Sequence, residues 1–176
     1  MRPRFLETSF AALCLGLLLA TAARGDTGSP WEAHPQMGRC FADAPAFIRA
    51  AFGEAGLEDE NIRSRPAKPL KDGSVWVIDY TPGTNYQWHL LQPGEGGQVC
   101  LTLFVPAAAQ VELSQKGREW TAKAKTQASP GLPAKQVEFK RPAGQGRFSA
   151  VACQEIDYTK SQAGSRRKVD CATVFD

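Results

Sequence analysis

The chain has 176 residues, of which 43% are hydrophobic, and a formal net charge of +3. This length suits one ordinary domain, and the apolar share is large enough to bury a core without a partner. After the N-terminal segment, no apolar run approaches the roughly 20 residues that a membrane-spanning helix needs. We therefore expect a globular protein with no membrane span.

The N-terminal segment has the features of a secretory signal peptide. Arg2 and Arg4 precede an apolar run over Phe10–Ala20, and small residues follow it. A basic head, a short apolar stretch and small residues in this order predict cleavage near Ala23 or Arg24. The protein is then exported, and either a periplasmic or a secreted location remains open.

The rest of the chain is predicted to form a single domain. After the signal peptide over 1–23, the segment 24–36 is polar, contains Gly and Pro, and indicates an extended leader. Residues 37–176 then form one disulfide-stapled domain. His34 lies in the leader, where we expect it to be away from any site.

One helix is predicted near the start of the domain. Asp43 is suited to cap it, and Pro45 suits its first turn. Apolar residues recur at helical spacing up to Gly56, which is expected to end the helix. They are Phe47, Ile48, Ala51, Phe52 and Ala55. The helix should therefore lie with one apolar face on a sheet.

Short strands with turns between neighbours account for the rest of the domain. A polar connection at Asn61–Asp72 leads to the strongest strand signals, which have Pro and Gly in the turns between them, as antiparallel hairpins do. These strands are Ser74–Tyr80, Tyr86–Gln92 and Gln98–Val105. Weaker signals follow, separated by a loop at Thr126–Lys135. They are Val111–Ser114, Glu119–Ala122, Gln136–Lys140, Phe148–Tyr158 and Arg167–Phe175.

The first hairpin has two faces of different character if Tyr80 pairs with Tyr86. Alternation along strands then gathers apolar and aromatic side chains on one face, which we interpret as core under the helix. That face holds Trp76, Ile78, Tyr80, Tyr86, Trp88 and Leu90. The other face holds Val75, Val77, Asp79, Gln87, His89 and Leu91.

On that second face, Asp79 and His89 are expected to be diagonal neighbours. A carboxylate that orients an imidazole is a unit of general-base catalysis, so His89 and Asp79 define an alternative function as a small hydrolase. No nucleophile elbow of the form Gly-x-Ser-x-Gly accompanies them. A polar, solvent-facing sheet surface is the competing interpretation.

The turn of the first hairpin is the candidate partner-binding loop. It is short and rich in Pro and Gly, and such a loop on a rigid scaffold is suited to enter a cleft of another protein. Its residues are Pro82, Gly83, Thr84, Asn85 and Tyr86. Over four residues it resembles the Ser-Gly-x-x-Tyr loop of bacterial periplasmic lysozyme inhibitors, but Pro82 replaces the Ser. This likeness does not identify a family.

Four of the five cysteines remain after Cys14 is removed with the signal peptide. An even number in an exported protein of this size predicts two disulfides. Folding the last hairpin about Gln162 places Cys153 opposite Cys171, which leaves Cys40 to pair with Cys100. No Cys-x-x-Cys pair or ligand spacing indicates redox or metal chemistry, and we expect no cofactor.

Charge is unevenly distributed along the chain. Residues 24–106 hold 7 basic and 10 acidic side chains, whereas residues 107–168 hold 12 basic and 5 acidic ones. The basic half can attract an acidic partner, but a solvated face that keeps the protein soluble is the interpretation we favour. Export makes nucleic acid an improbable target.

These observations predict an α+β fold, a meandering antiparallel sheet with one N-terminal helix packed on it. The function we expect is that of an exported, non-enzymatic binding protein, such as an inhibitor or immunity factor for an envelope or secreted enzyme. Its partner is then a protein in the envelope or extracellular space. The hydrolase and a cell-envelope structural or assembly factor that binds polyanionic polymer are the alternatives, and the oligomeric state is open.

Overall fold

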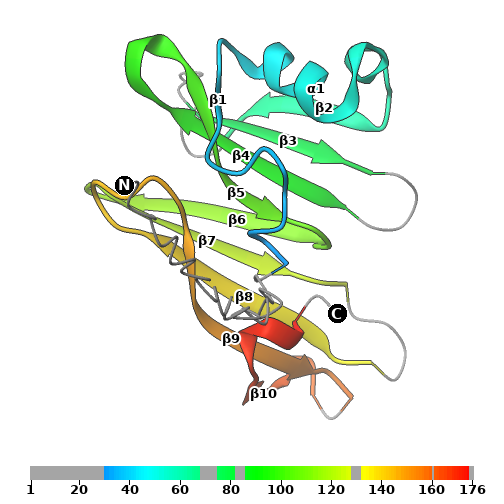
Figure 1. The fold of residues 1–176 in the computed structure, drawn as a ribbon. Helices are drawn as coiled ribbons and strands as arrows, with labels where there is room; N and C mark the ends of the chain where they lie inside the picture. Colours follow the sequence, from blue (N-terminus) through cyan, green and yellow to red (C-terminus); the bar gives the residue numbers. More distant parts are fainter. Residues whose placement is uncertain (1–29, 68–74, 82–85, 128–131, 160, 175–176) are drawn as a thin grey trace, which may run out of the picture.

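In the described part of the chain, one helix and two five-stranded antiparallel sheets form three layers, with the first sheet in the middle (Figure 1). The computed structural model describes residues 30–67, 75–81, 86–127, 132–159 and 161–174. The predicted signal peptide, the first half of the predicted leader and residues 82–85 of the candidate loop lie outside these ranges. The predicted α+β class, with antiparallel strands, one early helix and two disulfides, is confirmed.

The first sheet, called sheet A, has the strand order β1-β5-β4-β3-β2. Its strands are β1 (Cys40–Phe41), β2 (Ile62–Pro66), β3 (Trp76–Tyr80), β4 (Gln87–Pro93) and β5 (Val99–Val105). The second sheet, sheet B, has the order β10-β9-β8-β7-β6. Its strands are β6 (Gln110–Lys116), β7 (Glu119–Lys125), β8 (Ala134–Arg141), β9 (Ser149–Asp157) and β10 (Ser165–Lys168). Short 3₁₀ turns are η1 (Glu54–Leu57), η2 (Glu95–Gly97) and η3 (Cys171–Thr173).

The helix α1 (Ala44–Phe52) begins as the sequence predicts. The Asp43 carboxylate accepts a hydrogen bond from the Ala46 N–H at 2.7 Å, which satisfies one of the unpaired amides of the first turn. The helix ends earlier than predicted, because Gly53 rather than Gly56 adopts the positive φ of 80° that closes it. Phe47 and Ile48 are buried against sheet A.

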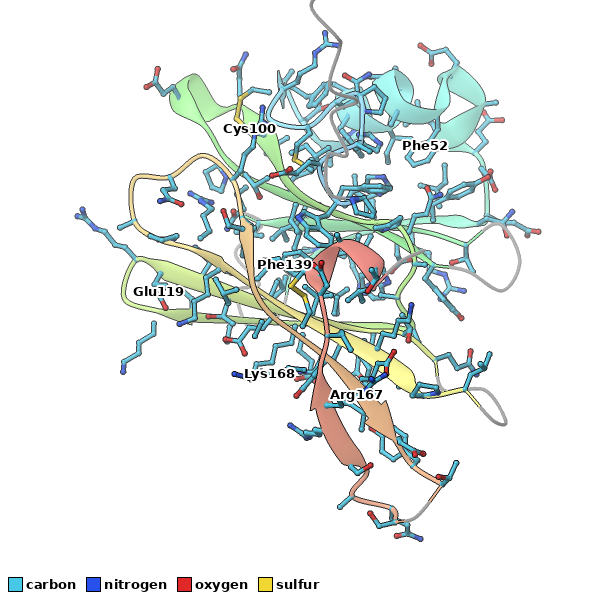
Figure 2. All side chains as sticks on the ribbon, turned by 60° about the horizontal axis from the view of Figure 1, so that its bottom comes forward. Phe52, Cys100, Glu119, Phe139, Arg167 and Lys168 are labelled. Atoms are coloured by element: carbon cyan, nitrogen blue, oxygen red, sulfur yellow. A yellow bond between two sulfur atoms is a disulfide. The ribbon has the colours of Figure 1, made fainter. Side chains whose placement is uncertain are left out.

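The strands predicted as one sheet form two sheets. Both faces of sheet A are apolar, so a helix on one face and a second sheet on the other are needed to bury them. Its helix side carries Ile78, Leu91 and Leu101, which pack against α1. Its other side also carries apolar residues, and a second layer has to cover them. Sheet B supplies that layer; Figure 2 shows Phe52 on the helix side and Phe139 between the sheets. The inter-sheet core includes Val77, Leu90, Leu103, Ala122, Val137 and Phe139.

Buried hydrogen bonds connect the two sheets where β4 and β8 end. The fully buried Gln92 amide accepts hydrogen bonds from the Thr102 hydroxyl, at 2.8 Å, and from the Arg141 guanidinium. Arg141 belongs to sheet B and the other two residues to sheet A. Because all three polar groups find partners, this contact stabilises the sandwich rather than weakening it.

Both predicted disulfides are present. Cys40 and Cys100 face each other directly across β1 and β5, with their Cα atoms 3.9 Å apart. Cys153 and Cys171 are also joined, at a Cα separation of 5.2 Å, but not as opposed strand residues. The hairpin register is offset, so that the Val169 N–H donates to the Cys153 carbonyl, and Cys171 opens η3 beyond the end of β10.

Candidate functional site

The pairing of β3 with β4 decides which side chains share a site. Tyr80 pairs with Gln87 and not with Tyr86, so the predicted register is wrong by one residue. A slip of one residue moves every side chain of a strand to the other face. Asp79 therefore lies opposite Trp88, and His89 lies opposite Ile78. The expected neighbours Asp79 and His89 point to opposite faces of sheet A, and the structure does not bring them together.

His89 lies instead in an aromatic cluster under the helix. His89 as a residue is 1% exposed, and its ring centroid is 5.3 Å from that of Phe47 and 5.1 Å from that of Phe104. Its Nδ1 lies 3.2 Å from the Ile78 carbonyl oxygen, whereas its Nε2 has no hydrogen-bond partner among the described residues. Burial lowers the pKa of His89 to about 3, and the neighbouring His34 contributes to this shift. His89 is thus a neutral core residue near neutral pH.

His34 is part of the same cluster, so the prediction of an unplaced histidine in an extended leader is wrong for this residue. Its ring centroid is 5.0 Å from that of His89 and 4.7 Å from that of Phe104. Burial lowers the pKa of His34 as well. Three residues earlier, Trp31 is buried against Phe139 of sheet B. The described part of the leader is therefore packed on both sheets.

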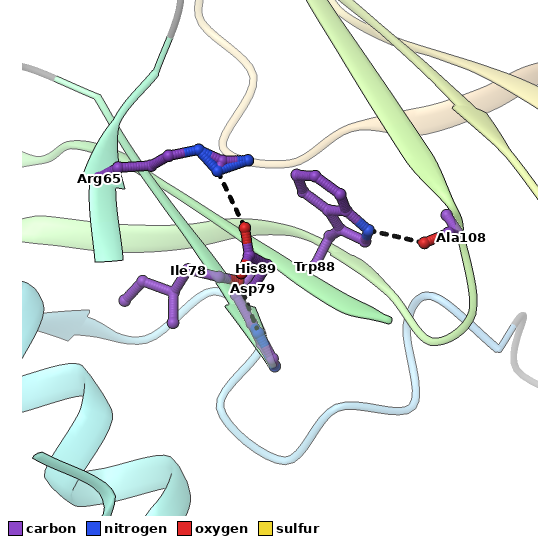
Figure 3. Close-up of polar contacts among 6 residues, drawn as sticks. All are labelled: Arg65, Ile78, Asp79, Trp88, His89 and Ala108. Atoms are coloured by element: carbon purple, nitrogen blue, oxygen red, sulfur yellow. Dashed lines mark hydrogen bonds and ion pairs between the residues drawn. The ribbon is translucent and has the colours of Figure 1, made fainter. Parts of the chain in front are cut away.

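Asp79 belongs to a different cluster, on the face of sheet A that is turned toward sheet B. Its carboxylate accepts a hydrogen bond from Arg65 Nη1 at 2.9 Å, and the Arg65 guanidinium lies 5.2 Å from the centre of the Trp88 ring (Figure 3). The Trp88 indole in turn donates its N–H to the Ala108 carbonyl at 2.8 Å. Three side chains from β2, β3 and β4 thus hold one another in a fixed arrangement.

Charge in this cluster is only partly balanced. Burial raises the pKa of Asp79, and the positive charges of Arg65 and Arg63 oppose that shift. Arg63 pairs with Asp79 across β2 and β3, so both arginines alternate onto the same face. Two guanidinium groups thus stand beside one carboxylate, and this part of the face is net positive.

An open groove of about 610 Å³ lies over the cluster. One wall is the end of β2 and the residue after it, Arg65–Ala67, and the other wall is the continuous run Val111–Gln115 of β6. Val77 and Trp88 form the floor between them. The groove is the place where the edge of sheet B stops short of the edge of sheet A. It offers an apolar floor, an indole and a guanidinium, which suit binding of a partner better than acid–base chemistry.

The candidate loop adjoins this groove along the chain, although only Tyr86 of its five residues is described. The Tyr86 carbonyl accepts a hydrogen bond from the Ala108 N–H at 3.0 Å. Ala108 is the same residue that accepts the bond from Trp88. The start of β4 is therefore fastened to the link between the two sheets, and this fixes β6 relative to the groove floor.

Among the described residues, no cluster of three or more His, Cys, Asp or Glu side chains could hold a metal ion. None of the helices in the described ranges has the length and apolar character for crossing a membrane. Comparison with models of protein families, with curated proteins and with solved structures finds no match to this chain.

The sequence does not reveal the groove because its two walls, 65–67 and 111–115, are distant in the chain, and the first lies in a mostly polar segment. Arg65 lies in the segment Asn61–Asp72, whose composition predicts a polar connection, yet that segment contains β2. A weak signal was present, since Ile62 and Ser64 alternate with two arginines before Pro66, a residue tolerated in edge strands. Nothing in the sequence indicated that Leu113 of sheet B would face Trp88 of sheet A.

Proposed function

We propose that this chain is an exported, non-enzymatic binding protein that holds another polypeptide in the groove between its two sheets. The observation that carries the proposal is the fixed arrangement of Trp88, Arg65 and Asp79 on the floor and wall of an open, largely apolar groove. Tryptophan and arginine are the residues most often responsible for binding energy at protein interfaces. Here both side chains are already held in place, so a partner loses little entropy in ordering them.

Two further features support this function. Two disulfides stiffen the scaffold and suit an oxidising compartment, in keeping with the signal peptide predicted over 1–23. The turn predicted at Pro82–Tyr86 directly precedes β4, whose second residue is Trp88, so one partner can contact the turn and the groove together. Inhibition of an envelope or secreted enzyme, or immunity to one, is the role that such a contact surface serves best.

The test compares partner capture by matched variants. The oxidised protein is immobilised and exposed to envelope and secreted extracts, and bound proteins are identified by mass spectrometry. A stoichiometric partner should bind the wild type and be lost with Trp88→Ala. The control is Trp76→Ala, which removes an indole from the same sheet but from the helix side. Equal capture by Trp88→Ala and wild type would overturn the groove as the contact surface.

The turn gives a second, independent prediction. Changing Gly83 or Asn85 to a bulky residue should weaken binding of the captured partner while the midpoint of thermal unfolding changes little. A large fall in thermal stability with unchanged binding would contradict the role of this turn in the interface.

A further inference from the structure

The two strands that border the groove differ in how well they resist pairing with a further strand. Both β2 and β6 are edge strands of their sheets, and an edge strand presents unpaired backbone N–H and C=O groups. In β2, Pro66 lacks an N–H, and Arg63 and Arg65 put charge beside the edge. Proline and charged side chains are the usual protection of an exposed edge.

β6 is protected less, because its charged side chains, Glu112 and Lys116, alternate onto the outer face of sheet B and not toward the groove. Its sequence Gln110–Lys116 contains no proline. Val111 and Leu113 pair with Ala124 and Ala122, which face the inter-sheet core, so these two apolar side chains point between the sheets, where they also border the groove. Within the described part of the chain, no strand pairs with the outer edge of β6. This edge is therefore open to a strand from elsewhere.

The groove has the right position for such a strand. Five consecutive residues of β6 line it, which means that the backbone edge itself forms the wall. A further strand would lie about 4.8 Å from β6, and packed sheets are about 10 Å apart. It would therefore continue sheet B beneath Val77 and Trp88. Every second side chain of that strand would point at this apolar floor.

The wall opposite β6, which contains Arg65, favours a negatively charged side chain on the incoming strand. The Arg65 side chain is 45% exposed and donates to Asp79 through an N–H of Nη1, and the guanidinium carries five N–H donors in all. Its remaining donors and the nearby Arg63 favour a carboxylate on the incoming strand. Glu112 also borders the groove, but alternation directs its side chain to the outer face of sheet B, where Gln110 donates to it at 2.9 Å.

We infer that the free edge of β6 binds an extended segment of the partner as an additional strand of sheet B, with an acidic side chain of that segment on Arg65. This inference rests on the proposed function and specifies the chemistry of the partner. Main-chain hydrogen bonds to β6 supply affinity, and the alternating apolar side chains and the acid supply selectivity.

The probe is a displayed library of random ten-residue peptides, selected on the immobilised oxidised protein. The selected peptides should show apolar residues at alternate positions and one Asp or Glu. Replacing the amides of a selected peptide one at a time by N-methyl amides should abolish binding at every second position and leave the positions between them unaffected. Loss with no such alternation would overturn strand addition.

The acid on Arg65 is tested by a double-mutant cycle. Changing the selected Glu or Asp of the peptide to its amide should weaken binding to the wild type about tenfold, as expected for a charge-assisted hydrogen bond. With Arg65→Gln the two peptides should bind equally. Arg49→Gln is the matched control, because Arg49 also forms an ion pair but lies on α1. If changing the peptide acid to its amide weakened binding equally in Arg65→Gln and Arg49→Gln, the assignment of the acid to Arg65 would be overturned.

Two further outcomes separate this inference from the proposed function. If no peptide is selected but a whole protein is captured in a Trp88-dependent manner, strand addition is wrong and the binding function stands. If sedimentation shows a dimer whose β6 amides are protected from hydrogen exchange without peptide, the edge belongs to a second copy and the inference is overturned. Failure of both peptide selection and capture would contradict the binding function itself.

Discussion

The two faces of sheet A are covered to different degrees. On the helix side, Phe47, Ile78 and Leu91 are completely buried, and His89 is enclosed there among aromatic rings with the half-buried His34 beside it. On the other side, sheet B covers Val77 and Leu90, but its edge stops at β6 and leaves Arg65 exposed over Trp88. The same strands thus contribute to a closed core on one face and to an open groove on the other.

This difference indicates a division between stability and binding. Side chains on the helix side gain free energy by burial and make no contact with the groove, so changes there should affect unfolding more than binding. Side chains at the groove are held by one another and are partly exposed, so changes there should do the reverse. Four measurements test this division, in order of decreasing expected effect.

The largest effect is expected for Phe47→Ala on the helix side. Phe47 is 0% exposed, and truncation of a buried phenylalanine costs about 3–5 kcal/mol of unfolding free energy. Denaturant unfolding measures that cost. Binding of a captured partner, measured under conditions where the variant is still folded, should be unchanged. A parallel loss of binding would remove the distinction between the two faces.

Acid should destabilise the helix side, mainly through the buried His89. The folded-state pKa of His89 is about 3, below the value near 6.5 of an unfolded chain. Between these values the unfolded state binds a proton that the folded state does not, so stability falls as the pH falls. The expected slope is about 1.4 kcal/mol per pH unit.

Unfolding curves collected between pH 7 and pH 4 measure this slope, and His89→Leu should reduce it. The pKa of His34 is lowered as well, so the His89 variant should keep a smaller dependence of stability on pH. An unchanged slope in the His89 variant would show that other groups control the acid response.

A smaller effect on stability, together with a clear effect on binding, is expected for Trp88→Phe. The change removes the N–H that bonds the Ala108 carbonyl and part of the ring that Arg65 covers. One lost hydrogen bond corresponds to about 1 kcal/mol. Partner affinity, measured by titration calorimetry, should fall at least tenfold. If the loss in free energy of unfolding exceeded the loss in free energy of partner binding, Trp88 would act as a core residue.

The smallest change in stability is expected for Arg65→Gln. The Arg65 side chain is 45% exposed, and ion pairs at such positions contribute at most about 1 kcal/mol. The free energy of unfolding of the variant should be close to that of the wild type, and Asp79 should keep its place in β3. A loss of several kcal/mol would mean that the buried carboxylate depends on Arg65 for the fold itself.

Local sequence patterns predicted the elements well where a single segment determines the outcome. Asp43 and Pro45 predicted the start of α1, and alternating apolar residues located β3, β4 and β5 within a few residues. Both disulfide pairings were also predicted correctly. These features depend on capping, alternation and cysteine number, which are visible without knowledge of the fold.

Features that depend on register or on contacts between distant segments were not predictable. The register of β3 against β4 depends on the number of turn residues, and an error of one placed Trp88 on the wrong face. β2 was missed because one face of this edge strand is polar. The pairing of His34 with His89, and of Trp88 with the β6 edge, joins segments that no local pattern connects.

The place of β1 in sheet A has a consequence for how the protein is made. Strands β2 to β5 follow one another as neighbours, but β1 comes first in the chain and pairs with β5. Cys40 therefore leaves the ribosome 60 residues before Cys100 and has no correct partner until the last strand of the meander has formed. In that interval a reduced Cys40 thiol can be oxidised or can form a disulfide with a wrong cysteine. Its pairing with Cys100 marks the completion of sheet A.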